Sequence, residues 1–246
     1  MINLFTADLI RVFCRKPRII LWLVTAAAIA LHCLGIKDST STLKMVSFGL
    51  DVFFPVALAA LGLVDFIFVF TDNLDSKADI SFPGRKERCW QFAAVKLLEA
   101  VIVFTVDLVM LNFVCLILIW TSLLNPAYMS VRLWAILNFS TWIRVMISML
   151  AGSVFLFGTD SITAAGVAYL TAVSGTAERL AAKVLQLPCL ANLHMDNWMP
   201  NNLAGTFASK LFLGVTDWAA AAALIAFCGL LMAAAFAAFK FRDLKI

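Results

Sequence analysis

The chain has 246 residues, of which 63% are hydrophobic and only 14% are charged, and its net charge is +4. This composition excludes an ordinary soluble domain, in which about a quarter of the residues carry charge. The positive charge does not indicate a nucleic-acid partner, because the basic residues are spread along the edges of apolar stretches. Most of the chain should therefore lie in lipid.

Residues 1–16 are too polar to cross a bilayer. Phe5, Leu9 and Phe13 recur there at helical spacing, whereas Arg15 and Lys16 project elsewhere. We expect an amphipathic helix over 1–17 that lies in the membrane interface and ends at Pro17. The alternative is a frayed cytoplasmic tail.

Six apolar stretches follow, and each predicts a membrane-spanning helix, since about 20 apolar residues in a helix cross the hydrocarbon layer and five of the six approach or exceed that length. The fifth is short and rich in Ala, Gly, Ser and Thr. The expected fold class is all-α, a single polytopic domain over 1–246. The spans are expected at 19–36, 47–70, 92–123, 133–157, 162–176 and 213–239.

These spans divide the chain into consecutive segments. The interfacial helix (1–17) precedes spans one and two (18–70), a cytoplasmic loop (71–91) and spans three to five (92–176). An extracytoplasmic segment (177–210) and the last span with its charged end (211–246) complete the chain. The segment 177–210 is expected to form one or two short helices that do not cross the membrane.

Lysine and arginine predict the orientation, because cytoplasmic loops carry an excess of them. With six spans and a cytoplasmic N-terminus, the inner side holds roughly twice as many basic residues as the outer side. Without the fifth span, Lys240, Arg242 and Lys245 would lie outside, which the same rule disfavours. We therefore expect a multi-pass protein of the cell membrane with both termini in the cytoplasm.

Motifs for catalysis are almost absent from the sequence. It has no Gly-rich loop followed by Lys and Ser or Thr, so the chain is not expected to hydrolyse nucleotides itself. His32 and His194 stand beside no carboxylate at ligand spacing, and the six cysteines form no C-x-x-C pair. Ser174 lacks the preceding glycine of a membrane serine nucleophile, and the small residues around it favour helix packing. We expect no enzyme activity, no cofactor and no metal.

Two charges lie inside predicted spans, where they are unfavourable unless paired. Asp107 lies ~16 Å along span three from Lys96, and Arg144 lies ~16 Å along span four from Arg132, at ~1.5 Å per residue. If the two spans are antiparallel neighbours, Asp107 and Arg144 should form an ion pair. Such a pair would fix the register of the spans, or it would belong to a substrate path.

The loop over 71–91 is the largest polar insertion on the basic side. Charged residues alternate there with apolar ones before Pro83-Gly84, which predicts a short amphipathic helix just outside the membrane. Its residues are Asp72, Asn73, Leu74, Asp75, Lys77, Ala78 and Asp79. Such a helix suits docking into a groove of a cytoplasmic protein, and the alternative is an ordinary solvated loop.

The order of these elements resembles the permease subunit of ATP-binding cassette exporters of the type-2 class (the type V exporter architecture). That family has an N-terminal elbow helix, six spans, a coupling helix between spans two and three, and short re-entrant helices between spans five and six. The matching segments here are 1–16, 71–80 and 183–210.

The motifs of the family match loosely. Asp72, Pro83, Arg85 and Lys96 follow the order of its coupling loop, and Phe241-Arg242-Asp243 is similar to its ending. The chain has Asp in place of the usual Glu, lacks a Gly-Thr pair, and has a longer spacing from Pro to Lys.

The resemblance implies a permease that forms a translocation path with a second permease chain, identical or different. Two copies of a separate nucleotide-binding ATPase subunit would seat the coupling residues and the elbow helix, with lipid around the spans and no nucleic acid. Small permeases of this kind are similar to those that expel antimicrobial peptides such as lantibiotics, and a lipid or a drug is equally open as substrate. The alternatives are an intramembrane enzyme and a non-transporting assembly or sensor subunit.

Overall fold

The computed structural model describes residues 9–37, 43–75, 89–121, 131–159, 161–185 and 199–243, and the regular structure in these ranges is helical. This confirms the expected all-α fold for the described part of the chain. The helices are α2 (Lys16–Lys37), α3 (Leu43–Asp75), α4 (Cys89–Trp120), α5 (Val131–Thr159), α6 (Ile162–Val173), α7 (Thr176–Leu185), α8 (Pro200–Phe212) and α9 (Trp218–Asp243).

Four of the described helices are long and apolar enough to cross a membrane. Their apolar stretches are Val52–Phe70, Ala94–Trp120, Val131–Thr159 and Trp218–Ala238. They belong to α3, α4, α5 and α9, at the places of predicted spans two, three, four and six. The 22-residue helix α2 coincides with predicted span one and also exposes large apolar side chains, among them Leu23, Val24 and Leu31.

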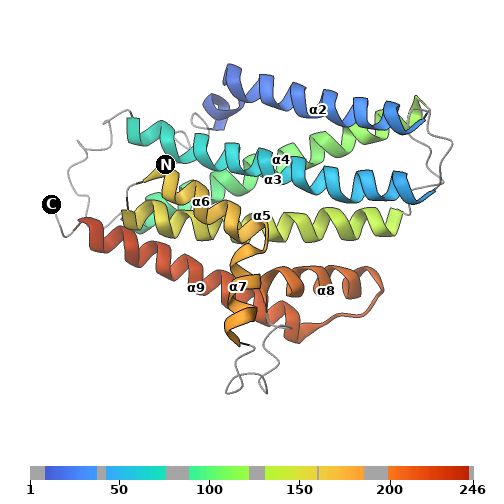
Figure 1. Cartoon of the computed structure of the whole chain (residues 1–246). Coiled ribbons are helices and arrows are strands. Elements are labelled where there is room, and N and C mark those ends of the chain that lie inside the picture. Colours follow the sequence, from blue (N-terminus) through green and yellow to red (C-terminus); the bar gives the residue numbers. More distant parts are fainter. Residues whose placement is uncertain are drawn as a thin grey trace.

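The long helices lie roughly side by side, with α5 at the centre (Figure 1). Helix α5 packs against α3, α4, α6, α8 and α9, whereas α2 packs on α3 and α4 at one side. Helices α3, α5 and α9 end at the left of Figure 1, and α2 begins on the same side but further from that end. We call the left end the near end and the opposite one, where α4 finishes and α5 begins, the far end.

Polar side chains inside the bundle fix the register of α4 against α5. The indole of Trp134 donates to Asn112 Oδ1 (2.7 Å), and the amide of Asn112 donates to Asn138 Oδ1 (2.7 Å). About two turns further along α5, Trp142 Nε1 donates to Thr105 Oγ1 of α4 at 3.0 Å. These groups are neutral, so their burial is less unfavourable than that of charges.

Helices α3, α5 and α6 approach one another closely at Gly62. A Cβ at this position would lie 2.6 Å from Tyr169 Oη and 2.7 Å from Val145 Cγ1, so no larger residue fits without movement. The same Tyr169 hydroxyl donates to the carbonyl of Ala59 at 2.8 Å. Glycine is therefore needed here for close packing between helices.

Two short helices, α6 at predicted span five and α8 in the segment predicted outside the membrane, lie along α5. The 12 residues of α6 reach about 18 Å at 1.5 Å per residue, too short to cross a membrane alone. The 13-residue helix α8 lies along the other half of α5, because Asn201 contacts Arg144 and Phe212 contacts Arg132.

This arrangement differs from the prediction of one continuous helix over 162–176 and a separate segment outside the membrane. Helix α6 ends at Val173, and Gly175 then adopts a positive φ of 68°, which glycine tolerates and most other residues do not. The chain leaves the bundle there as α7, which runs across the direction of α5 in Figure 1. The prediction placed α8 outside the membrane because its sequence contains Asn201, Asn202 and Lys210.

Candidate functional site

Three charged residues from three helices meet inside the bundle, and we call them the charged triad. Arg18 of α2 donates from Nε to Asp65 Oδ1 of α3 (2.9 Å) and from Nη2 to Asp107 Oδ1 of α4 (2.6 Å). The exposed fractions of the three residues are 5%, 1% and 3%. A fully buried arginine that joins two carboxylates ties the start of α2 to both neighbouring helices.

Local sequence explains how Arg18 reaches this position. Pro17 lies in the first turn of α2, where its missing N–H removes no helical hydrogen bond. The expectation that Pro17 ends the preceding helix is therefore wrong, and the helical backbone before α2 instead stops at Phe13. The ring of Phe13 covers the guanidinium of Arg18 at 4.5 Å, a favourable cation–π contact.

The described part of the predicted elbow helix packs against the bundle. Leu9 and Phe13 contact the hydrophobic core, and Arg15 lies over the ring of Phe68 at 5.3 Å. Lys16 is the first residue of α2, and Phe5 lies outside the described residues. The segment 9–15 is thus held at the near end by apolar and cation–π contacts.

The predicted ion pair between Asp107 and Arg144 is wrong, because Asp107 binds Arg18 and Arg144 faces α8. Helix geometry gives the reason. Thr105 and Trp142 face each other between α4 and α5, and a residue two positions further along a helix is rotated by about 200°. Asp107 and Arg144 therefore point away from the shared interface, and the register role expected of them belongs to the neutral network of Asn112.

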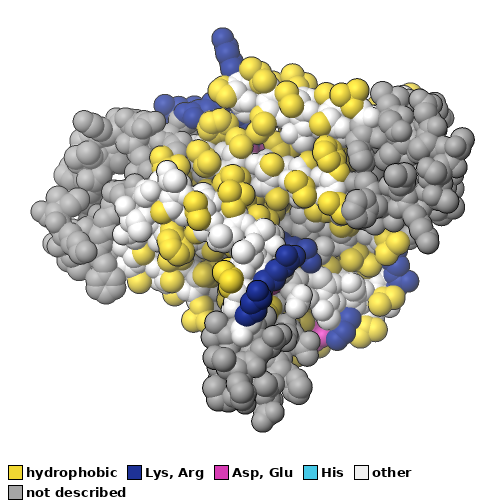
Figure 2. Space-filling view, viewed as in Figure 1, with side chains coloured by type: hydrophobic (Ala, Val, Ile, Leu, Met, Phe, Trp, Pro, Cys, Tyr) yellow, Lys and Arg dark blue, Asp and Glu magenta, His cyan; other side chains and the backbone are white. Residues whose placement is uncertain are grey.

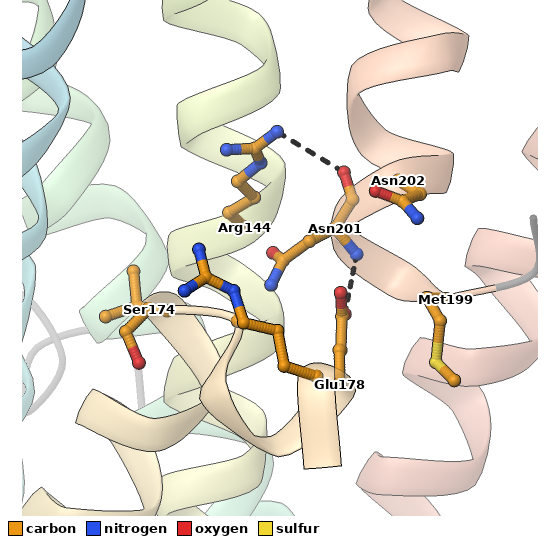
Figure 3. Close-up of a pocket in the computed structure, with 9 residues that line it drawn as sticks. Arg144, Ser174, Glu178, Met199, Asn201 and Asn202 are labelled. Carbon is orange, nitrogen blue, oxygen red and sulfur yellow. Dashed lines mark hydrogen bonds between the residues drawn. The ribbon is translucent and has the colours of Figure 1, made fainter. Parts of the chain in front are cut away.

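A second polar cluster lies half-way along α5, and we call it the central pocket. It has a volume of about 340 Å³ and is lined by Arg144, Val173, Ser174, Gly175, Glu178, Arg179, Met199, Asn201 and Asn202. Figure 3 shows the side chains of Arg144 and Glu178 approaching Asn201 from two sides. The pocket thus forms where α5, the turn after α6, α7 and the start of α8 meet.

Asn201 joins the helices around the central pocket. Its backbone N–H donates to Glu178 Oε1 (2.7 Å), its side-chain amide donates to the carbonyl of Ala172 at the end of α6 (3.1 Å), and its own carbonyl accepts from Arg144 Nη2 (3.4 Å). A Cβ at Gly205 would lie 3.4 Å from the Arg144 guanidinium, so a small residue leaves it room. The two half-length helices are therefore linked through one residue.

Glu178 supplies the one carboxylate among the residues that line this pocket. It is half-buried and lies at the N-terminus of α8, whose partial positive charge stabilises an anion. Burial raises the pKa of Glu178 above its ordinary value, and the hydrogen bonds with Asn201 and the charge of Arg144 oppose that rise.

The depth of the central pocket follows from contacts at both ends of α5. Arg132 contacts Phe212 at the far end, and Gly158 lies beside Ala238 at the near end. Arg144 lies about midway between them. On the face shown in Figure 2, Lys and Arg side chains stand over α7 in the middle of a largely hydrophobic surface, and Arg179 is exposed.

The predicted coupling residues are only partly described. Asp72, Asn73, Leu74 and Asp75 have helical backbone and continue α3 without a break, so a separate helix does not begin at 71. Lys77, Ala78 and Asp79 lie outside the described residues. What the structure shows is that α3 extends beyond its apolar stretch, which ends at Phe70.

No family model matches this chain, and comparisons with curated proteins and with solved structures returned no match. The function is therefore argued from the residues themselves.

Proposed function

We propose that this chain is the membrane-spanning permease subunit of an ATP-driven exporter of the type-2 class. The observation that carries the proposal is the central pocket. It combines two arginines, a glutamate and two asparagines at half the depth of a largely apolar bundle.

Charges at half-depth favour a water-filled space next to the pocket. An exposed Arg179 in contact with lipid at this depth would be unfavourable, so residues of this kind usually face a cavity or a partner. Broken helices with polar ends at mid-depth are typical of transporters, where they form substrate sites. The pair α6 and α8 has this form, with the carbonyl of Ala172 and the N–H of Asn201 at the break.

The proposed topology counts α6 and α8 together as one crossing. Helices α2, α3, α4, α5 and α9 supply the others, which gives six crossings with the near end in the cytoplasm. Both basic ends of the chain then lie on the cytoplasmic side of the membrane, as the excess of lysine and arginine favours.

In the proposed mechanism, energy reaches the spans through the near end. Helix α3 extends beyond Phe70 to Asp75, a length suited to contact with a cytoplasmic subunit. Two copies of a separate nucleotide-binding ATPase would engage this extension and residues 76–79. The charged triad would pass their movement to α2, since Arg18 ties α2 to both α3 and α4.

The proposal is tested by purifying the full chain from its native membranes in mild detergent. We expect an ATP-hydrolysing subunit to co-purify, and its ATPase activity to fall several-fold when Leu74→Asp disrupts the docking surface. Thr121→Ala, at the far end of α4, is the matched control and should leave the ATPase activity unchanged.

Two outcomes would contradict this proposal. The first is a purified chain that associates with no ATP-hydrolysing subunit. The second is labelling of Ser76→Cys and Lys245→Cys from opposite sides of sealed vesicles, because both positions belong to the cytoplasmic side in the proposed topology.

A further inference from the structure

The central pocket carries more positive than negative charge. Arg144 and Arg179 contribute two guanidinium groups, and Glu178 contributes one carboxylate. Arg144 Nε is buried and has no hydrogen-bond partner among the described residues. A buried donor without an acceptor is unfavourable, so the pocket is suited to a bound anion that supplies one.

Glu178 shows which chemistry the pocket accepts. Its carboxylate already lies at the start of α8, on the N–H of Asn201, on the side of the pocket that Arg144 also faces. An oxyanion from a ligand would meet the same kind of donors: a guanidinium, an amide and a helix N-terminus. Glu178 opposes such a ligand while it is ionised.

An apolar groove adjoins the central pocket at the turn between α6 and α7. Ala172 and Ala177 line the groove, and Val173, Ser174 and Gly175 between them line the pocket. The groove has a volume of about 650 Å³ and lies between α5 and α6, with Ala151, Phe155, Ala164, Val167 and Ala168 along it.

The groove suits a hydrocarbon chain better than a peptide. Two of its three hydroxyl groups are already engaged, because Ser161 Oγ accepts from the backbone of Ala164 and Thr171 Oγ1 donates to the carbonyl of Ala168. A peptide backbone placed there would leave its own N–H and C=O groups without partners, which is unfavourable in an apolar setting. An acyl chain brings no such groups.

We propose that the central pocket binds the phosphate headgroup of an anionic lipid while one of its acyl chains lies in the groove between α5 and α6. This inference rests on the proposed function, because it names the substrate class of the same path. Arg144 and Arg179 contact the phosphate, and Val167 and Phe155 contact the chain.

The test measures binding by the full chain in nanodiscs of phosphatidylcholine, with a fluorescent phosphatidylglycerol as probe. Arg144→Gln should weaken binding about tenfold, since a charge-assisted hydrogen bond is lost. Glu178→Gln should strengthen binding several-fold, because the amide can still accept from Asn201 while the opposing charge is gone. Lys183→Gln is the control: it lies on α7 with Glu178 but lines neither the central pocket nor the groove, so it should leave the affinity unchanged.

A second arm separates a lipid from a free phosphate. Val167 is exposed in the groove, so Val167→Trp fills it with little effect on folding, and binding of phosphatidylglycerol should fall. Soluble glycerol phosphate should compete only at concentrations far above those of the lipid. Full competition by glycerol phosphate, with no effect of Val167→Trp, would overturn the lipid assignment.

An equal loss of binding in Arg144→Gln and Lys183→Gln would also overturn the inference, since it would show unspecific attraction. The measurement uses neither ATP nor a partner subunit. If no ATPase co-purifies, the proposed function is contradicted but the lipid-binding result remains valid. If the chain does not bind phosphatidylglycerol, only the inference about the lipid is contradicted.

Discussion

The charged triad and the central pocket place charges at neighbouring depths in very different settings. In the triad, Arg18 is buried and holds two carboxylates at 2.9 and 2.6 Å. In the pocket, Arg144 makes one long bond of 3.4 Å to a carbonyl, and Arg179 is exposed. A paired and buried arginine holds helices together, whereas an accessible one remains available to a ligand.

The largest expected effect breaks the triad. Arg18→Gln leaves Asp65 and Asp107 buried without their cation, which should lower the free energy of unfolding by about 3–5 kcal/mol. Thermal unfolding in detergent measures it. The variant that also carries Asp65→Asn and Asp107→Asn removes the uncompensated charge and should recover most of the loss. No recovery would show that Arg18 acts through packing and not through charge.

The second prediction concerns Gly62, which lies between the charged triad and the central pocket. Gly62 lies one turn from Asp65 on α3 and against Val145, the neighbour of Arg144. Gly62→Ala should destabilise the chain by about 1–3 kcal/mol through overpacking. Gly229→Ala in α9 is the control, because nothing lies within 4 Å of the added Cβ, and a gain of about 0.5–1 kcal/mol is expected. Equal effects in the same unfolding measurement would refute the close approach.

The third prediction sharpens the contrast between the two arginines. Arg144→Gln should change the free energy of unfolding by about 1 kcal/mol or less, because it removes one weak hydrogen bond. A loss as large as that of Arg18→Gln would show that Arg144 is structural. The comparison is made on both variants under identical conditions in detergent.

The smallest expected effect is the pH dependence that Glu178 contributes. Burial raises its pKa in the folded chain, whereas the unfolded chain releases the proton near the ordinary value of about 4.3. Stability should therefore fall as the pH rises from that value through the raised one, since the unfolded chain then binds fewer protons. Subtracting the unfolding profile of Glu178→Gln from that of the wild type isolates this slope, and a difference of opposite sign would contradict the burial.

The long helices could be predicted because length and apolarity determine them. The ends of α4 and α5 fall within a few residues of the expected ones, since both helices follow continuous apolar runs. The position of α8 could not be predicted, because its sequence is partly polar and resembles a segment outside the membrane. In the structure, contacts with Arg132 and Arg144 and the packing of Leu203 against α5 and α9 place α8 inside the bundle.

The ion-pair partners of the buried charges could not be predicted from the sequence either. The sequence shows Asp107 and Arg144 at similar depths, but not which face of each helix meets the other. In the sequence, Arg18 stands at the edge of the first apolar stretch and Asp65 near the end of the second, and neither position shows which charge it binds. The one available signal was Thr105 and Trp142, whose hydrogen-bonding side chains mark the face shared by α4 and α5.

The division of one proposed crossing between α6 and α8 has a consequence for how the chain is made. A helix of 12 residues, or one of 13 that carries Lys210, is too short to partition into a bilayer by its own hydrophobicity. Each half must be held in place by neighbouring helices, α6 by α5, and α8 by both α5 and α9. In the proposed topology, contacts between helices and not the hydrophobicity of either half therefore bring this crossing into the bilayer.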